Sequence, residues 1–360
     1  DKFLLEDYGI GSNPYSLKKK MRIGLVDIDA LLAPPQTHFQ FSVKIPEKSY
    51  LEFTYGIKRD SEFLEEKTKR KADFRVLLEV GKSRVELFNK TLELTDPNTP
   101  LVFNFKKIDL SNFGGKQGKF LFTTTGDRES LAFWFNPVIY QPQNKTSNVI
   151  LISLDTLRAD HLGCYGYNRN TSPTIDALAE ESALFLNTYA PSPWTLPSHV
   201  SLMTSLNTIN HGVYQNGQKI DASIPTLADF LRVNGFFTTA FTGGGFVSGL
   251  FGLHKGFDSY HVRGGIQNAN AAEVLCRAAL DWLDRNKDRS FFLFLHTYQI
   301  HNPFVCPPPY NEMFLEEGAE YKGIDTNDLR IASENRYKPL SDALRQNIVD
   351  LYDAGIRYTD

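Results

Sequence analysis

Cysteine is scarce in this chain of 360 residues, and the few that occur argue against two kinds of site. Cys164, Cys276 and Cys306 lie far apart, and none belongs to a Cys-x-x-Cys pair. This spacing argues against a zinc site built from thiolates, and it leaves one odd thiol if any two form a disulfide. We interpret all three as packing residues.

Long apolar runs and a strong net charge are also missing. No stretch of about 18 apolar residues occurs, so we expect no transmembrane helix. Lysine and arginine number 39 against 42 aspartates and glutamates, a formal net charge of -3. This balance does not call for nucleic acid or an anionic membrane surface as a partner. No signal peptide is visible, but the chain opens on Asp1 rather than on methionine, so the compartment stays open.

The pattern of apolar residues changes near residue 146 and predicts two domains. Before it, short alternating segments rich in Phe, Val and Leu are each closed by turn residues, which is typical of an antiparallel β-sandwich. We predict this sandwich over residues 1–145, with a charged, solvated loop from Arg59 to Lys71 and a polar linker from Gln141 to Ser147. The expected strands are residues 39–45, 74–80, 101–105 and 119–125.

Beyond the linker, strands alternate with helical stretches, as they do in βαβ units. We therefore predict an α/β domain over residues 146–360. Its expected helices are residues 172–185, 227–234 and 271–285, and its expected strands are residues 148–154, 236–241 and 291–296.

Two segments of this second half carry residues suited to chemistry. The apolar strand Asn148-Val-Ile-Leu-Ile-Ser-Leu-Asp155 reads as a buried central strand that ends on an acid, and α/β sheets place reactive residues at such ends. In Ser192-Pro-Trp-Thr-Leu-Pro-Ser-His199, Pro197 suits the first turn of a helix, which puts Thr195 just before a helix N-terminus that favours an anion. A hydroxyl, an anion site and a nearby carboxylate are what an ester hydrolase of oxyanions needs.

Five segments resemble motifs of the sulfatases, a branch of the alkaline phosphatase superfamily. They occur in the family's order: Asn148-Val-Ile-Leu-Ile-Ser-Leu-Asp-Thr-Leu-Arg-Ala-Asp-His-Leu-Gly-Cys-Tyr-Gly166, Ser172-Pro-Thr-Ile-Asp-Ala-Leu-Ala179, Trp194-Thr-Leu-Pro-Ser-His-Val-Ser-Leu-Met-Thr204, Lys255-Gly-Phe-Asp258 and His301-Asn-Pro-Phe-Val-Cys-Pro-Pro308. The first and third are highly specific. The resemblance implies a partial alkaline-phosphatase-like domain from about Asn148 onward, with a mixed sheet flanked by helices.

The resemblance also implies roles for single residues. Asp155 matches the acid that binds a divalent cation, and Thr195 matches the residue that is both nucleophile and metal ligand. His199 stands at the place of the motif arginine. His301 matches a histidine that contacts the oxyanion or protonates the leaving oxygen, and a histidine can do either near neutral pH.

Three departures from the family pattern change what is expected. Sulfatases use a cysteine or serine that is oxidised to an aldehyde, and Thr195 cannot yield one, so phosphorus esters rival sulfate esters as substrates. The family often has Asp-Asp where this chain has Asp155-Thr156. The remaining metal ligands of the family follow a helix like the one that ends at Asp360, so we expect a C-terminally truncated sequence with those ligands beyond it.

Three functions remain open on this basis. The first is a sulfate ester or phosphate ester hydrolase that acts on a small molecule or a glycan at calcium, magnesium or manganese, with zinc as an alternative. The second is a phosphodiester or phosphonate hydrolase, or a transferase of a phosphoryl-linked head group. The third is a carbohydrate-binding protein with a degenerate hydrolase domain, because Ile108-Asp-Leu-Ser-Asn-Phe-Gly-Gly115 is similar to a turn of galactose-binding-like jelly rolls. An extracytoplasmic location fits a glycan-directed member of the family.

Overall fold

The computed structural model divides the chain into two compact units. One unit comprises Asp1–Ser147 with two short later segments, Gly235–Phe237 and Asp288–Ser290, and the other comprises the rest. The structure describes residues 3–4, 18–23, 26–33, 36–58, 70–95, 101–127, 131–142, 147–315 and 340–360. Most of the predicted charged loop and of the predicted linker lies outside these residues.

The first unit is built from two antiparallel sheets. One has the strand order β4-β9-β6-β7, and the other has the order β3-β10-β5-β8, with β1 paired to β10 and β2 to β3. The strands are β1 (Phe3–Leu4), β2 (Lys18–Ile23), β3 (Val26–Leu32), β4 (Thr37–Lys44), β5 (Tyr50–Lys58), β6 (Arg70–Val80), β7 (Ser83–Leu94), β8 (Leu101–Asp109), β9 (Gln117–Gly126) and β10 (Leu131–Tyr140). The predicted antiparallel architecture is confirmed.

Aromatic side chains fill the space between these two sheets. Trp134 lies at the centre, with Phe53, Phe74 and Phe122 packed edge-on around it at ring distances of 5.3, 5.2 and 4.9 Å. Its buried indole N–H donates to the Thr124 hydroxyl at 2.9 Å. This hydrogen bond avoids the free-energy cost of burying an unpaired donor in the core. Alternating apolar residues on both sheets therefore face one shared core.

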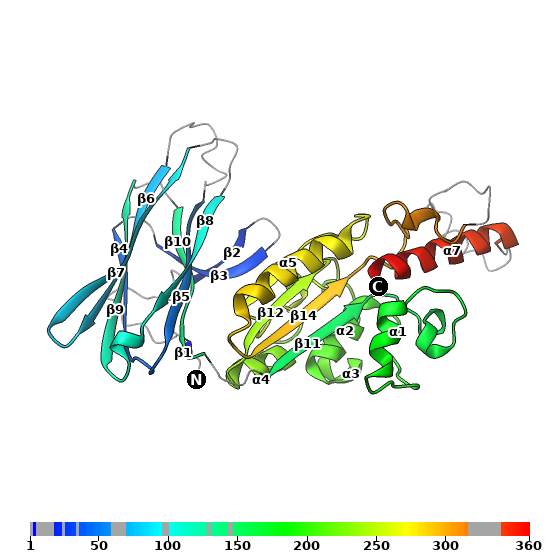
Figure 1. Ribbon diagram of the computed structural model, residues 1–360, viewed down its shortest axis with the longest axis horizontal. Coiled ribbons are helices and arrows are strands. Elements are labelled where there is room, and N and C mark those ends of the chain that lie inside the picture. Colours follow the sequence, from blue (N-terminus) through cyan, green and yellow to red (C-terminus); the bar gives the residue numbers. More distant parts are fainter. Residues whose placement is uncertain are drawn as a thin grey trace. The chain divides into compact units, whose positions relative to one another are not determined.

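The second unit is an α/β structure around a parallel sheet. The strand order is β11-β14-β12-β13, formed by β11 (Asn148–Leu154), β14 (Phe291–Thr297), β12 (Phe237–Thr242) and β13 (Ser259–Val262). Figure 1 shows β14 between β11 and β12, with the carboxyl ends of these strands pointing toward α1 and α7. The predicted α/β fold class is confirmed.

The position of β11 corrects one prediction. The apolar strand was expected at the buried centre of the sheet, but among the described residues it pairs only with β14 and forms the edge. Ile150 and Ile152 are consequently 51% and 57% exposed.

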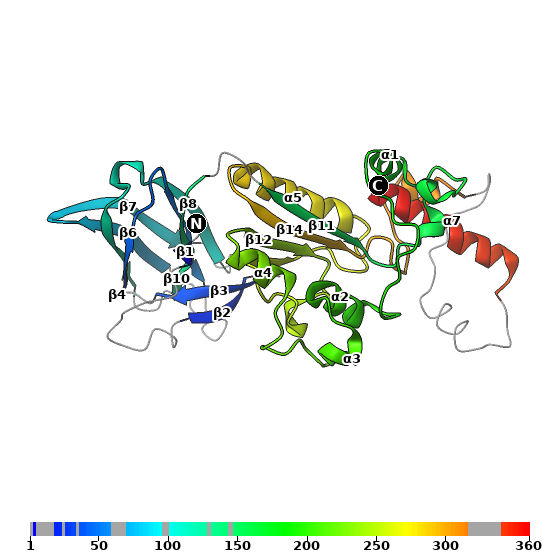
Figure 2. The ribbon, with the colours of Figure 1, turned by 90° about the horizontal axis from the view of Figure 1, so that it is seen from below.

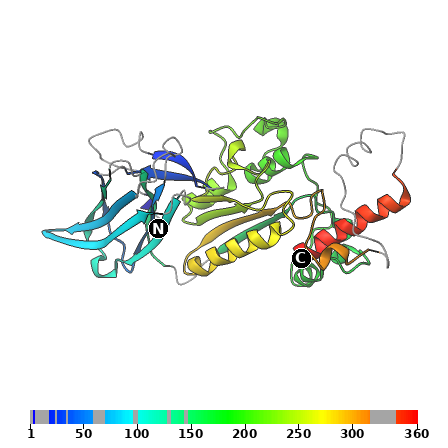
Figure 3. The same ribbon diagram turned by 90° about the horizontal axis from the view of Figure 1, so that it is seen from above.

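Helices cover both faces of this sheet. Figures 2 and 3 show α5 on one face and α2, α3 and α4 on the other. The described α-helices are α1 (Pro173–Glu180), α2 (Thr195–Thr204), α3 (Thr208–His211), α4 (Leu227–Val233), α5 (Ala271–Asn286) and α7 (Asp342–Thr359). The described 3-10 helices, of which η3 belongs to the first unit, are η3 (Ser111–Phe113), η4 (Ala159–His161), η5 (Gly163–Tyr165), η6 (Gly249–Phe251) and η7 (Tyr310–Glu312). None of the described helices combines the length and the hydrophobicity that a membrane span requires.

Helix α1 differs from its prediction in length and in its cap. It ends at Glu180 instead of Phe185. Ser172 precedes it as expected, but its hydroxyl accepts from the Gly163 N–H and donates to Asp176. The carboxylate of Asp360 accepts from the N–H groups of the first turn instead, so a residue at the end of α7 caps the helix.

Candidate functional site

Asp155 directly follows β11 at the carboxyl edge of the parallel sheet. Its backbone N–H donates to the carbonyl of Thr297 at 3.1 Å, which fixes it beside the end of β14. The residue is only 8% exposed, although it carries an acid. A buried carboxylate at this edge requires partners for its oxygens.

Two buried histidines supply partners for this acid. The side-chain donor atoms of Asp155, His199 and His296 all lie within 4.8 Å of one another. His296 comes from β14 and His199 from α2, and their rings meet edge-on at 4.9 Å. A carboxylate oxygen and two imidazoles thus converge in one buried cluster.

The hydrogen bonds of His199 assign the proton on its ring. Nδ1 lies 2.8 Å from the Thr195 carbonyl, which can only accept, so Nδ1 carries the hydrogen and donates it. Nε2 then holds the lone pair, to which the Ser153 hydroxyl donates at 2.9 Å. Burial, together with the charge of nearby His296, lowers the pKa of His199 to about 4. Near neutral pH His199 is therefore a neutral imidazole whose Nε2 can act as an electron-pair donor.

His296 has the opposite arrangement of donor and acceptor. Its Nδ1 accepts from the backbone N–H of Gly243 at 3.3 Å, so Nε2 carries the hydrogen and donates to Asp155 Oδ2 at 3.4 Å. Gly243 is required for this approach, because a Cβ there would lie 2.7 Å from the ring of Tyr298. In this form His296 orients Asp155 rather than offering an electron pair.

The same contacts keep Asp155 ionised. Burial alone would raise the pKa of its carboxyl, but the hydrogen bond from His296 and the charge that His296 and His199 carry when they are protonated outweigh burial, with help from the Thr195 hydroxyl. The net shift is downward. A carboxylate with a low pKa and few partners is a suitable cation ligand.

Thr195 is the first residue of α2, with Trp194 as the N-cap. We expected it one position earlier, just before the helix. Its hydroxyl interacts with Asp155, and its carbonyl holds His199, so one residue touches two members of the cluster. The hydroxyl and the free N–H groups of the first turn therefore lie at the same edge of the sheet.

His301 lies in the loop after β14, one aromatic ring away from the cluster. The ring of Tyr298 packs edge-on against both His301 at 5.5 Å and His296 at 4.6 Å. Nδ1 of His301 donates to the Asn302 carbonyl at 2.8 Å, which leaves the lone pair on Nε2 of this half-buried ring. The structure thus brings Asp155, Thr195 and His199 together and sets His301 further out.

Sequence reasoning underrated His296 and missed its supports. His296 is the last residue of the strand expected at residues 291–296, and that position at a strand end was the available signal. No sequence pattern indicated that Ser153, Gly243 and Tyr298 support the cluster, because each contact joins residues from different strands, helices or loops.

The cluster suits a divalent cation chemically. Asp155 and Thr195 offer oxygen, and His199 offers nitrogen from a position where its other ring nitrogen is held by a carbonyl. Metal-binding histidines usually have this arrangement. The residues present therefore fit the metal that the resemblance implies, with a mixed oxygen and nitrogen donor set.

The fold and the cluster define a class: an α/β protein with a candidate cation site at the carboxyl edge of a parallel sheet. The family model named Sulfatase matches residues 147–360, more than half of the chain. The chain belongs to the sulfatase family.

Individual relatives match over shorter stretches. The N-acetylgalactosamine-6-O-sulfatase of Bacteroides thetaiotaomicron is 34% identical over 96 residues, 25% of this chain and 19% of the relative. The N-acetylglucosamine-6-O-sulfatase of the same organism is 23% identical over 205 residues, 51% of this chain and 36% of the relative. These matches span about a fifth to a third of the curated relatives.

Among solved structures, the phosphonate monoester hydrolase of Agrobacterium radiobacter aligns with a TM-score of 0.46 at 21% identity. The alignment covers 59% of this chain and 56% of that chain.

Proposed function

We propose that this sulfatase-family protein hydrolyses a sulfate ester or a phosphate ester, with Thr195 as the nucleophile and Asp155 as a cation ligand. The observation that carries the proposal is the buried cluster of Asp155, His199 and His296, against which the Thr195 hydroxyl lies. Burying this many ionisable groups costs free energy, and such clusters concentrate at functional sites. The curated relatives named above are sulfatases of amino sugars, which supports a sulfated or phosphorylated glycan as substrate.

The residues divide the chemistry among them. A divalent cation bound by Asp155, Thr195 and His199 would lower the pKa of the Thr195 hydroxyl and draw negative charge off the substrate oxygens. Thr195 Oγ1 would give up its hydroxyl proton to water as it attacks sulfur or phosphorus in line. His301, once protonated at Nε2, would give a proton to the ester oxygen as the bond to that oxygen breaks. Water then cleaves the threonyl ester and restores the hydroxyl. His296 holds Asp155 in place throughout.

Thr195 also supports a second candidate, cleavage of a phosphodiester or phosphonate or transfer of a phosphoryl-linked group. A threonine cannot form the aldehyde on which formylglycine sulfatases depend, so its ester must be resolved by water or by an acceptor alcohol. Product that forms only when an acceptor alcohol is present would identify a transferase.

The donor set narrows the choice of cation. Imidazole nitrogen suits zinc better than calcium, magnesium or manganese, which prefer oxygen ligands. We therefore propose zinc at this site.

The two predicted domains, 1–145 and 146–360, are proposed to divide the work. The sandwich would serve as a galactose-binding-like jelly-roll module that contacts the glycan, and the α/β domain would carry the chemistry. A carbohydrate-binding protein without turnover is the alternative.

Substitution of Thr195 tests the proposed function. Thr195→Ala should reduce turnover of p-nitrophenyl sulfate, p-nitrophenyl phosphate and bis-p-nitrophenyl phosphate by on the order of 10³-fold or more, because the attacking oxygen is gone. Thr195→Ser keeps a hydroxyl and should retain part of the activity.

Thr208→Ala is the matched control, since Thr208 is likewise the first residue of a helix. Its turnover should equal that of the unsubstituted protein. Full activity in Thr195→Ala would sink the proposal, and the preferred ester in the unsubstituted protein decides between sulfur and phosphorus.

A further inference from the structure

The turn after Asp155 has a backbone conformation that its residue disfavours. Thr156 has a φ of 65°, in the left-handed region, which is rare for a β-branched residue. Its hydroxyl donates back to the Asp155 carbonyl at 2.6 Å. Such strained residues persist only where the surrounding structure holds them.

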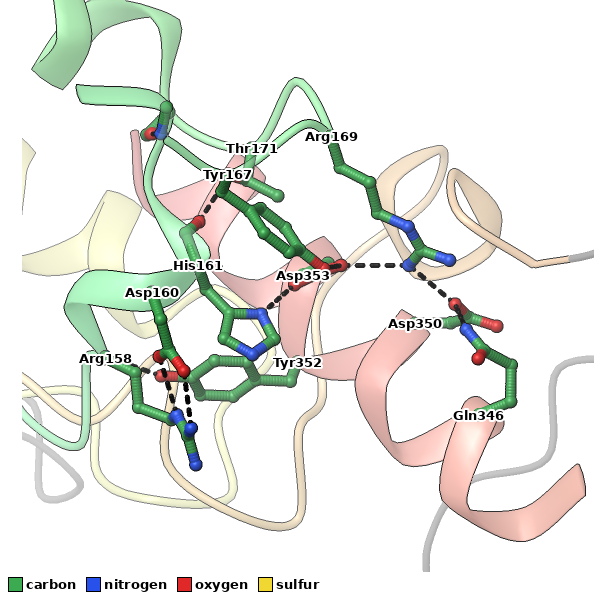
Figure 4. A network of polar contacts seen from close by, with 12 residues as sticks. Arg158, Asp160, His161, Tyr167, Arg169, Thr171, Gln346, Asp350, Tyr352 and Asp353 are labelled. Carbon is green, nitrogen blue, oxygen red and sulfur yellow. Dashed lines mark hydrogen bonds and ion pairs between the residues drawn. The ribbon is translucent and has the colours of Figure 1, made fainter. Parts of the chain in front are cut away.

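One side chain of α7 holds this turn from both sides. The Tyr352 hydroxyl donates to the Thr156 carbonyl at 2.7 Å and accepts from the Arg158 N–H at 2.8 Å. The residue is 8% exposed, and its ring packs edge-on against His161 at 4.9 Å. Figure 4 shows Tyr352 beside Arg158 and His161. Tyr352 thus replaces the backbone partners that the turn cannot find within itself.

The next residue of α7 anchors the helix to the same stretch of chain. The fully buried carboxylate of Asp353 accepts from His161 Nδ1 at 2.6 Å, from the Tyr167 hydroxyl at 2.7 Å and from Arg169 at 2.9 Å. Figure 4 shows these three side chains converging on Asp353. The anchor fixes the position of α7, and Tyr352 transmits that position to the turn.

We infer that Tyr352 is a positioning residue for the candidate cation site, acting by fixing the turn that begins at Asp155. The inference rests on the proposed function, because the consequence of fixing Asp155 is cation binding. Tyr352 lies outside the cluster, and its hydroxyl bonds to backbone groups of the turn, at Thr156 and Arg158. Its hydroxyl, rather than its ring, is the group that matters.

Tyr352→Phe in the full chain tests this, because it removes the hydroxyl and keeps the ring packing. Zinc affinity, measured by calorimetric titration of metal-free protein, should weaken about tenfold, the lower end of what loss of a supporting partner costs a metal site. Hydrogen exchange of the Arg158 amide should accelerate, since its acceptor is gone.

Tyr167→Phe is the matched control. It also removes a hydroxyl bonded to the same network, but that hydroxyl reaches Asp353 and not the turn. Its zinc affinity should stay within about twofold of the unsubstituted protein. Equal zinc affinities for all three proteins would overturn the inference, and so would an unchanged Arg158 exchange rate in Tyr352→Phe.

Failure of the proposed function gives a different pattern. If the unsubstituted protein binds no divalent cation, the cation role of the cluster is wrong, and the Arg158 exchange rate alone decides whether Tyr352 holds the turn. Faster exchange would support the inference, and unchanged exchange would overturn it.

Discussion

Two buried carboxylates of the α/β unit, Asp353 and Asp155, differ in how fully they are bonded. Asp353 is 0% exposed and accepts short bonds from a histidine, a tyrosine and an arginine. Asp155 is 8% exposed and, among the residues that the structure describes, has one long bond of 3.4 Å from His296 besides its interaction with Thr195. Burial alone therefore does not identify a functional acid, because both of these carboxylates are buried. An incompletely bonded buried acid has capacity left for a ligand, whereas a saturated one stabilises the fold.

The largest expected contrast is in stability. Asp353→Ala should lower the free energy of unfolding by about 3–5 kcal/mol, because it removes the buried acceptor of His161 and Tyr167 and one of the two acidic partners of Arg169. Asp155→Ala should cost less than about 1 kcal/mol, because the cost of burying the carboxylate disappears with its few bonds.

Urea denaturation of both variants, followed at the α/β unit, measures the difference. Zinc titration should give the reverse order, with binding lost in Asp155→Ala and only weakened in any folded Asp353→Ala, which keeps every residue of the cluster. Equal losses of stability would mean that Asp155 is a structural acid as well.

The sequence predicted those features of the Asp155 site that depend on local residue patterns. Apolar strands followed by Asp155 and His296 predict polar residues at one sheet edge, because parallel strands end together. Pro197 predicted a helix N-terminus beside Thr195, with His199 two residues further along the helix. The fold class and the elements that carry the site followed from these regularities.

The features that the sequence did not predict depend on contacts between residues far apart in the chain. Asp353 and Tyr352 meet residues almost 200 positions earlier, and no spacing reveals such a contact. The edge position of β11 and the cap from Asp360 escaped for the same reason. Whether a buried polar group is satisfied is a tertiary property, so the pattern could name Asp155 without showing how few bonds it makes.

The pH dependence of the free energy of unfolding should show whether His199 is buried as a neutral imidazole. In the folded metal-free protein, burial holds the pKa of His199 at about 4, below the ordinary value of 6.5. The unfolded chain therefore takes up a proton below about pH 6.5 that the folded chain refuses. The pKa shift of His199 therefore contributes about 3 kcal/mol to the free energy of unfolding. This contribution is fully present above pH 6.5 and is lost as the pH falls toward 4.

Chemical denaturation between pH 4 and 7 measures this effect. His199→Gln removes one proton uptake on unfolding, so the slope of the free energy of unfolding against pH should decrease by about 1.4 kcal/mol per pH unit. Buried His296 and His211 and half-buried His261 have pKa values shifted in the same direction and will leave a residual slope. His38→Gln, at an exposed position of β4, is the control and should leave the slope unchanged. An unaltered slope in His199→Gln would show that its ring is solvated or charged in the folded protein.

The smallest expected effect concerns the one bond that competes with a ligand. In the metal-free protein the Ser153 hydroxyl donates to Nε2 of His199, the lone pair that a cation would use. Ser153→Ala removes this competitor, so zinc affinity should rise by roughly fivefold, the equivalent of about 1 kcal/mol. Calcium affinity should change less, because calcium prefers oxygen ligands. Weaker zinc binding in Ser153→Ala would instead make Ser153 a support of the imidazole, and the cluster would then resemble the saturated network around Asp353 more than an open site.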